Sequence, residues 1–221
     1  MFFKGIPLFS GLSDAEHGLL LQVAVRKNYP RNSLIIQQGD VGESLYLLRR
    51  GRAKVYLSEP GGREVILAFL GPGDFLGEMA LIDDEPCSAS VMPTEESEFV
   101  SVNKKDFLRV LASSPSMAVN LLKAMSGRLR ESNQQIESLA LKDVHARVQQ
   151  VLHQISEPEG SDLVVPARFT HRDIASMVGA SREMVTRVLG ALEQSGFVRV
   201  DGRRIALSGL AIRDLPNEPA G

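Results

Sequence analysis

The spacing of apolar residues divides the chain into stretches of different periodicity. Between Ser33 and Val102, short runs rich in Val, Ile, Leu, Phe and Tyr are separated by glycines, which is typical of short strands joined by tight turns. From Pro115 to about Asp143, apolar residues return at helical spacing. Three shorter helices are expected nearer the C-terminus, the first of them from Val144 to Ile155. The pattern therefore predicts an α+β chain: an N-terminal antiparallel β jelly roll, a long helix and a helical C-terminal region.

The N-terminal part is expected to contain one capped helix before the strands begin. Ser13 precedes Asp14 and Glu16, as an N-cap residue does, and Leu20 follows at helical spacing. His17 is expected on the surface of this helix, because no other metal-ligand residue lies near it at ligand spacing. The six runs expected to form strands are SLIIQQ, SLYLLRR, AKVYLSE, EVILAFL, CSASVM and EFVSV.

The long helix carries a heptad pattern, with apolar positions that alternate between steps of three and four residues. Its members are Leu122, Met125, Leu129, Ser132, Ile136 and Leu139. We call these six residues the seam. Such a seam favours the pairing of two chains, with polar Ser132 as its one anomaly. The alternative is a single amphipathic helix packed against its own roll.

Thr170 to Glu193 predicts two helices joined by a tight turn. Thr170 can cap a first helix from Arg172 to Val178, Gly179 supplies the turn, and Ser181 can cap a second helix. At about 100° per residue, the second helix separates a polar arc from an apolar one. The polar arc holds Arg182, Glu183, Thr186 and Arg187, and the apolar arc holds Val185, Val188, Leu189 and Leu192.

The polar arc has the chemistry of a DNA-recognition helix. The planar fork of Arg matches the two acceptors of guanine, and Glu accepts from the amino group of cytosine. Recognition helices meet base edges near their N-terminus, where this arc lies. The alternative interpretation is that Glu183 and Arg187 form only a surface ion pair between residues i and i+4.

The second helix and its turn resemble the DNA-binding motif of the Crp/Fnr family of bacterial transcription regulators. The pattern G-x-S-R-E-x-V-x-R of that family falls on Gly179, Ser181, Arg182, Glu183, Val185 and Arg187. The resemblance implies that Arg182, Glu183 and Arg187 read bases. It also implies that His171 and Ser181 approach phosphates, although His171 stands where a relative can carry Arg.

The segment after the second helix predicts a β-hairpin. SGFVRVDGRRIALSG gives two short strands around Asp201 and Gly202, which completes a winged helix-turn-helix. Arg203 and Arg204 lie at this wing and are expected to meet phosphate. SEPEGSD (156–162) is expected to be an exposed turn. In activators of the family a loop at this place touches RNA polymerase, which makes the polymerase a candidate partner.

The segment GDFLGEMALIDDEPCSAS resembles the phosphate-binding cassette of cyclic-nucleotide-binding rolls. The matching residues are Gly77, Glu78 and Ser88, whereas Cys87 stands where nucleotide binders of the family have Arg. Losing an Arg fork removes a contact worth a few kcal/mol, which lowers affinity for cyclic AMP on the order of a hundredfold or more. The resemblance also implies that Ser132 and Asn133 contact the ligand base from both subunits.

Three interpretations of the cassette remain open. It binds a different ligand, such as cyclic di-GMP or another nucleotide; it binds nothing and serves as a dimer scaffold; or Cys87 senses a reactive species. The neighbouring acidic run Asp83, Asp84 and Glu85 is expected to be a solvated turn rather than a metal site.

Composition limits the cellular compartment and the class of function that the sequence allows. The 221 residues carry a net charge of −2, so a basic patch for nucleic acid must be local, and the arginines from Arg168 to Arg204 supply it. Cys87 is the single cysteine, which favours a reducing cytoplasm and excludes both an intrachain disulfide and a cysteine-held iron–sulfur cluster. The first residues indicate neither a secretory signal nor a membrane span.

These features predict three regions: a cyclic-nucleotide-binding-like sensor roll (1–114), a dimerisation helix (115–142) and a winged helix-turn-helix (143–221), with a hinge near Leu141 to Val144. The predicted function is a homodimeric regulator of transcription that binds double-stranded DNA at a palindromic operator. The alternative is a nucleotide-sensing module that acts on a protein partner without DNA. An enzyme is not expected, because the sequence has no nucleophile with a base, metal-ligand spacing or phosphate loop.

Overall fold

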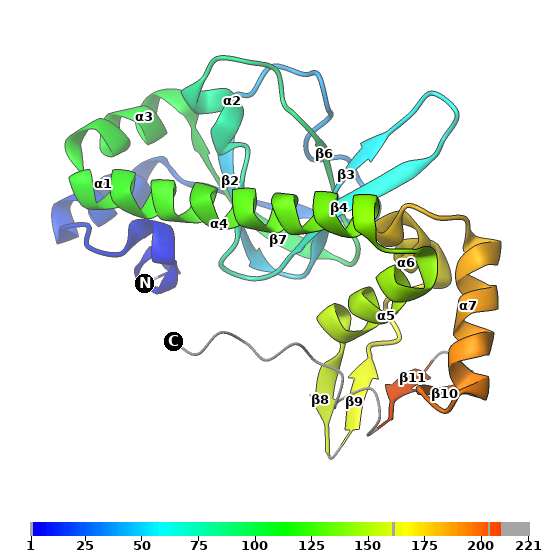
Figure 1. Ribbon diagram of the computed structural model, residues 1–221. Coiled ribbons are helices and arrows are strands. Elements are labelled where there is room, and N and C mark those ends of the chain that lie inside the picture. Colours follow the sequence, from blue (N-terminus) through cyan, green and yellow to red (C-terminus); the bar gives the residue numbers. More distant parts are fainter. Residues whose placement is uncertain (1, 161, 203, 209–221) are drawn as a thin grey trace. The chain divides into compact units, whose positions relative to one another are not determined.

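The computed structural model describes residues 2–160, 162–202 and 204–208 (Figure 1). The chain divides into two units, Met1–Ser132 and Asn133–Gly221, and the boundary falls within the long helix α4 (Pro115–Leu141). In the part of the chain that is described, no helix is both long and apolar enough to cross a membrane.

The first unit contains two antiparallel sheets, as the alternation of short apolar runs and glycines predicted. One sheet has the strand order β1-β7-β2-β5 and the other β4-β3-β6. The strands are β1 (Val25–Tyr29), β2 (Ser44–Arg50), β3 (Ala53–Ser58), β4 (Glu64–Leu70), β5 (Phe75–Leu76), β6 (Ser90–Pro93) and β7 (Ser97–Asn103). A core cluster that includes Leu48, Leu70 and Phe99 draws side chains from both sheets. The predicted antiparallel roll is confirmed.

Helices cover the first sheet of this unit. They are the 3₁₀ turns η1 (Phe2–Gly5) and η2 (Pro7–Phe9), α1 (Asp14–Val23), the short α2 (Glu78–Ile82), α3 (Lys104–Ser113) and the first part of α4. The main core of the unit joins Phe9 and Leu20 to Leu45 in β2, Phe107 in α3 and Met117 in α4. One face of α4 is therefore held by the roll.

Two strand predictions need correction. The run SLIIQQ contributes only an isolated bridge between Ile36 and Val91. By contrast, β1 was not expected, because its sequence VRKNY does not alternate apolar and polar residues. In the structure four of its five residues are exposed. It is a strand because it pairs with β7 along its whole length, from Val25 opposite Ser101 to Tyr29 opposite Ser97. A tertiary partner thus overrides weak local propensity.

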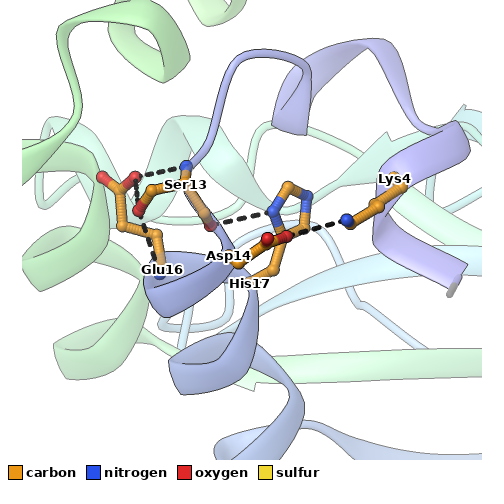
Figure 2. Close-up of polar contacts among 5 residues, drawn as sticks. All are labelled: Lys4, Ser13, Asp14, Glu16 and His17. Carbon is orange, nitrogen blue, oxygen red and sulfur yellow. Dashed lines mark hydrogen bonds and ion pairs between the residues drawn. The ribbon is translucent and has the colours of Figure 1, made fainter.

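The N-terminus of α1 is fixed by a capping box, which Figure 2 shows. Glu16 N donates to Ser13 Oγ at 3.3 Å, and Ser13 N donates to Glu16 Oε2 at 2.7 Å. His17 was expected on the surface but is only 5% exposed, and its Nδ1 lies 3.0 Å from the carbonyl oxygen of Ser13. The surface prediction was wrong, because His17 shares the core-facing side of α1 with Leu20.

The second unit is a helical domain with one small sheet. After α4, its elements are α5 (Val144–Ile155), β8 (Glu157–Glu159), β9 (Asp162–Val165), α6 (His171–Val178), α7 (Arg182–Gln194), β10 (Val198–Asp201) and β11 (Arg204–Leu207). The sheet order is β10-β11-β9-β8, and the core packs Leu152, Ile174, Val185 and Leu189 together. The predicted wing is thus present, in a sheet that also contains β8 and β9.

The links between these elements follow local capping chemistry. Helix α4 ends at Leu141, and α5 begins after Asp143, whose side chain accepts from Ala146 N at 2.8 Å. The helix therefore breaks where the sequence predicted a hinge. The segment SEPEGSD, expected to be a turn, instead contributes most of the β8–β9 hairpin, with Gly160 at φ +65° in its turn.

Candidate functional site: a helix-turn-helix and a glycine-rich cassette

Three residues at the helix ends set the bounds of α6 and α7, and all of them were expected from the sequence. Thr170 forms a capping box with Asp173, whose backbone N–H donates to Thr170 Oγ1 at 3.2 Å. Gly179 ends α6 at φ +63°, in the left-handed region that favours glycine. Ser181 then caps α7 by accepting from Met184 N at 3.1 Å. Two short helices are thereby held together with almost no connecting chain.

Helix α7 has the two faces that the sequence predicted. Val185, Val188, Leu189 and Leu192 are buried, whereas Arg182, Glu183, Thr186 and Arg187 are exposed. Among the described residues no ion pair joins Glu183 to Arg187, so the alternative of a simple surface ion pair is not realised. The polar arc is left open toward solvent.

The charge on Glu183 is set by the N-terminus of α7. A backbone N–H, then the Ser181 hydroxyl and then the Arg182 charge hold the pKa of the Glu183 carboxyl below its usual value. The group is therefore a carboxylate at neutral pH. It offers acceptors beside the donors of Arg182, which is the mixed pattern that base edges require.

A polar link ties the start of α6 to α7. His171 Nδ1 lies 3.1 Å from Thr186 Oγ1, and the Thr186 hydroxyl donates to the carbonyl oxygen of Arg182 at 3.0 Å. Because that hydroxyl proton is engaged, Thr186 Oγ1 accepts from His171. Arg203 lies outside the described residues. Its neighbour Arg204 donates to Glu159 Oε1 at 2.9 Å.

The cassette of the first unit is organised around Gly77 and Glu78. Gly77 has φ +86°, and a Cβ there would lie 2.8 Å from the carbonyl oxygen of Ser44, so only glycine fits without a shift of the backbone. Glu78 begins α2 and is 2% exposed. The hydroxyl of Ser88 donates to the Met79 sulfur at 3.9 Å. These contacts place Ser88 against the same short helix as Glu78.

Cys87 is a buried thiol, 8% exposed. Its backbone is fixed to the preceding loop, since Cys87 N donates to Asp40 O at 2.8 Å and Gly39 N donates to Cys87 O at 2.9 Å. Burial raises the pKa of the Cys87 thiol, and the Asp40 carboxylate raises it further. A protonated, buried thiol is a poor nucleophile, which weakens the interpretation of Cys87 as a sensor of reactive species.

Arg128 is a site residue that the sequence reasoning missed. Its Nη1 donates to Glu78 Oε1 at 2.6 Å, its Nη2 donates to the carbonyl oxygen of Phe75, and its guanidinium lies 4.6 Å from the centre of the Phe75 ring. The other oxygen of Glu78, Oε2, is buried without a hydrogen-bond partner in the described part of the chain. The sequence offered one signal for this residue: Arg128 is a basic residue next to the seam, one helical turn before Ser132.

Ser132 and Asn133 are exposed polar residues of α4. No described contact joins Ser132 to the cassette. The acidic run Asp83 to Glu85 is exposed, and Asp84 pairs with Lys104. Nowhere in the described ranges do three or more His, Cys, Asp or Glu side chains gather as a metal site.

The roll that holds the cassette and the domain that holds the helix-turn-helix both match models of known families. Residues 26–114 match the cyclic nucleotide-binding domain, and residues 146–211 match the Crp-like helix-turn-helix domain. A "Cyclic AMP receptor protein" of Thermus thermophilus is 36% identical over 197 residues, which cover 89% of this chain and 90% of that protein. This chain belongs to the Crp/Fnr family of transcription regulators.

Other relatives support the same assignment. A "CRP-like cAMP-activated global transcriptional regulator" of Mycobacterium tuberculosis is 30% identical over 205 residues, covering 91% of this chain and 92% of that protein. The solved structure of the c-di-GMP-responsive global regulator CLP of Xanthomonas campestris is 26% identical, with a TM-score of 0.77, and covers 89% of this chain and all of that one. The Crp/Fnr family consists of DNA-binding regulators, not enzymes, so the chain is a DNA-binding transcription regulator with a cyclic nucleotide-binding domain.

Proposed function

We propose that the protein acts as a homodimer that binds a palindromic operator and is controlled by a nucleotide held in the cassette. The observation that carries the dimer is the seam of α4. Leu122, Leu129 and Ile136 are 66%, 63% and 64% exposed, whereas the neighbouring Met117 and Leu121 are buried in the core of the roll and the seam residue Met125 packs partly against that core. Large apolar side chains in a row at heptad spacing favour a second helix as their cover.

In this proposal the three regions have separate tasks. Residues 1–114 sense the effector, 115–142 pair the subunits and 143–221 bind DNA. Arg182, Glu183 and Arg187 read bases, while His171, Ser181, Thr186 and Arg203 position the helix against the phosphate backbone. Two copies of α7 would then read half-sites about 34 Å apart. RNA polymerase is the further partner expected of an activator.

The proposed effector is a nucleotide other than cyclic AMP, with cyclic di-GMP as the first candidate. Gly77, Glu78, Cys87 and Ser88 would surround it, together with Ser132 and Asn133 from the paired helices. Glu78 keeps a buried oxygen free to accept from a ligand hydroxyl. Cys87, however, offers no positive charge to a cyclic phosphate, and Arg128 already holds Glu78. This donor set argues against a cyclic AMP site of the usual kind.

Calorimetric titration with cyclic AMP, cyclic GMP and cyclic di-GMP tests the effector directly. The proposal expects cyclic di-GMP to bind at least tenfold more tightly than cyclic AMP and to strengthen binding to a palindromic duplex in a gel shift. Tighter binding of cyclic AMP would overturn the effector assignment. Strong operator binding that no nucleotide alters would instead support the cassette as a scaffold.

A further inference from the structure

The arginines around the helix-turn-helix fall into two groups by their partners. Arg172, Arg182 and Arg187, on α6 and α7, have no ion pair within the described residues. The arginines on the flanking segments do have partners: Arg168 before α6, Arg199 in β10 and Arg204 in β11. Among the described arginines of this region, three are therefore available to DNA and three are engaged by carboxylates.

All three partners come from one hairpin, β8–β9. Glu157 pairs with Arg168, Asp162 lies 3.5 Å from Arg199, and Glu159 lies 2.9 Å from Arg204. Glu157 and Glu159 are two positions apart on β8 and so share one face of the strand. Glu159 is opposite Asp162 in the hairpin register. A single acidic hairpin thus neutralises three cations drawn from three different segments.

These ion pairs are exposed to solvent, so another anion can replace the carboxylate beside each arginine. The side chains of Glu157, Glu159 and Asp162 are 51%, 62% and 40% exposed. Ion pairs between exposed groups are individually weak. A DNA phosphate near Arg168, Arg199 or Arg204 would compete with a carboxylate already in place, so each of these contacts would be gained only after the carboxylate releases the arginine.

We propose that the β8–β9 hairpin is an internal competitor of DNA phosphate that limits sequence-independent binding. Counterion release at phosphate contacts supplies most of the affinity for non-cognate duplex. By holding three flanking arginines, the hairpin leaves Arg172, Arg182 and Arg187 as the described arginines of this region that are available to DNA. Two of these three lie on the base-reading arc of α7. Affinity then depends more on the correct sequence than it would with six free arginines.

The test is a variant that releases the arginines, Glu157→Gln, Glu159→Gln and Asp162→Asn together. Binding to a non-cognate duplex is measured by fluorescence anisotropy between 50 and 300 mM salt. The slope of log affinity against log salt should become steeper by about 0.9 for each arginine released, and non-cognate affinity should rise roughly tenfold. The ratio of cognate to non-cognate affinity should fall.

A matched control separates this effect from net charge. Glu95→Gln, Glu96→Gln and Glu131→Gln make the same change in charge at exposed carboxylates for which no ion pair is described. A hairpin variant whose salt slope equals that of the wild type or of this control would overturn the proposal. Arg204→Gln gives a second readout: it should leave the slope unchanged in the wild type but reduce it by about 0.9 in the hairpin variant. An equal effect in both backgrounds would also contradict the proposal.

Discussion

Arg182 and Glu183 occupy adjacent positions of the first turn of α7, and neither is committed to a partner that would keep it from DNA. Arg182 has no described ion pair, and Glu183 receives its hydrogen bonds from the helix terminus itself. Because these contacts are local, they follow from the order of residues alone. This is why the sequence could predict the polar arc, its cap at Ser181 and the glycine turn before it.

Replacing Arg182 with Ala is expected to cost about 1–3 kcal/mol at the cognate operator and to relax the preference for one base. Competition gel shifts with operators changed one base at a time measure both effects. Arg172→Ala, at an exposed position of α6, is the matched control and should leave base preference intact. An equal loss on all sequences would mean that Arg182 contacts only phosphate.

Cys87→Arg is expected to raise affinity for cyclic AMP by about a hundredfold, since it restores a charge-assisted fork beside Ser88. Calorimetry measures the change. Cys87→Ser, which removes the thiol without adding charge, should leave the affinity as it is. If the two variants bind cyclic AMP equally, the resemblance of the cassette to nucleotide sites fails at this position.

At the scale of elements, local signals predicted most helices better than they predicted the sheet edges, although α3 with its Asn103 cap was not expected. Capping boxes at Ser13 and Thr170 mark helix starts because both partners lie within four residues. The polar strand β1 and the pair between Arg128 and Glu78 depend on residues that are distant in the chain. Strand β1 and the Arg128–Glu78 pair therefore need the tertiary fold. The burial of His17, by contrast, had a local signal, because His17 lies three residues before Leu20 and so on the same side of α1.

Gly179→Ala is expected to destabilise the second unit by about 1–2 kcal/mol, because φ +63° is unfavourable for a residue with a Cβ. Urea unfolding followed by circular dichroism measures the loss. Gly190→Ala offers a matched control, because Gly190 lies inside α7 and an added Cβ would meet nothing within 4 Å. That change should stabilise the protein by about 0.4–1 kcal/mol. Equal effects at the two positions would contradict the role of the turn.

At the scale of the whole molecule, the proposed dimer depends on the seam of α4, which would let two copies of α7 act together. Leu129→Glu places a charge among exposed apolar residues that the proposed dimer would bury. The variant should sediment as a monomer at micromolar concentration and lose most of its affinity for the palindrome, while half-site binding stays weak but measurable. Analytical ultracentrifugation and gel shifts test this. Gln134→Glu, at an exposed position of α4 off the seam, should remain dimeric.

The contact between Arg128 and Glu78 has a consequence for how the effector should be measured. Arg128 immediately precedes Leu129, so the group that holds the cassette carboxylate and a residue of the proposed dimer contact occupy one turn of one helix. If a nucleotide displaces this guanidinium and thereby shifts Leu129, its binding is coupled to association of the proposed dimer, and thermodynamic reciprocity then requires the converse. The apparent affinity for the effector should therefore change when the protein is diluted to concentrations near the dissociation constant of the proposed dimer. Titrations at different protein concentrations would then give different apparent affinities.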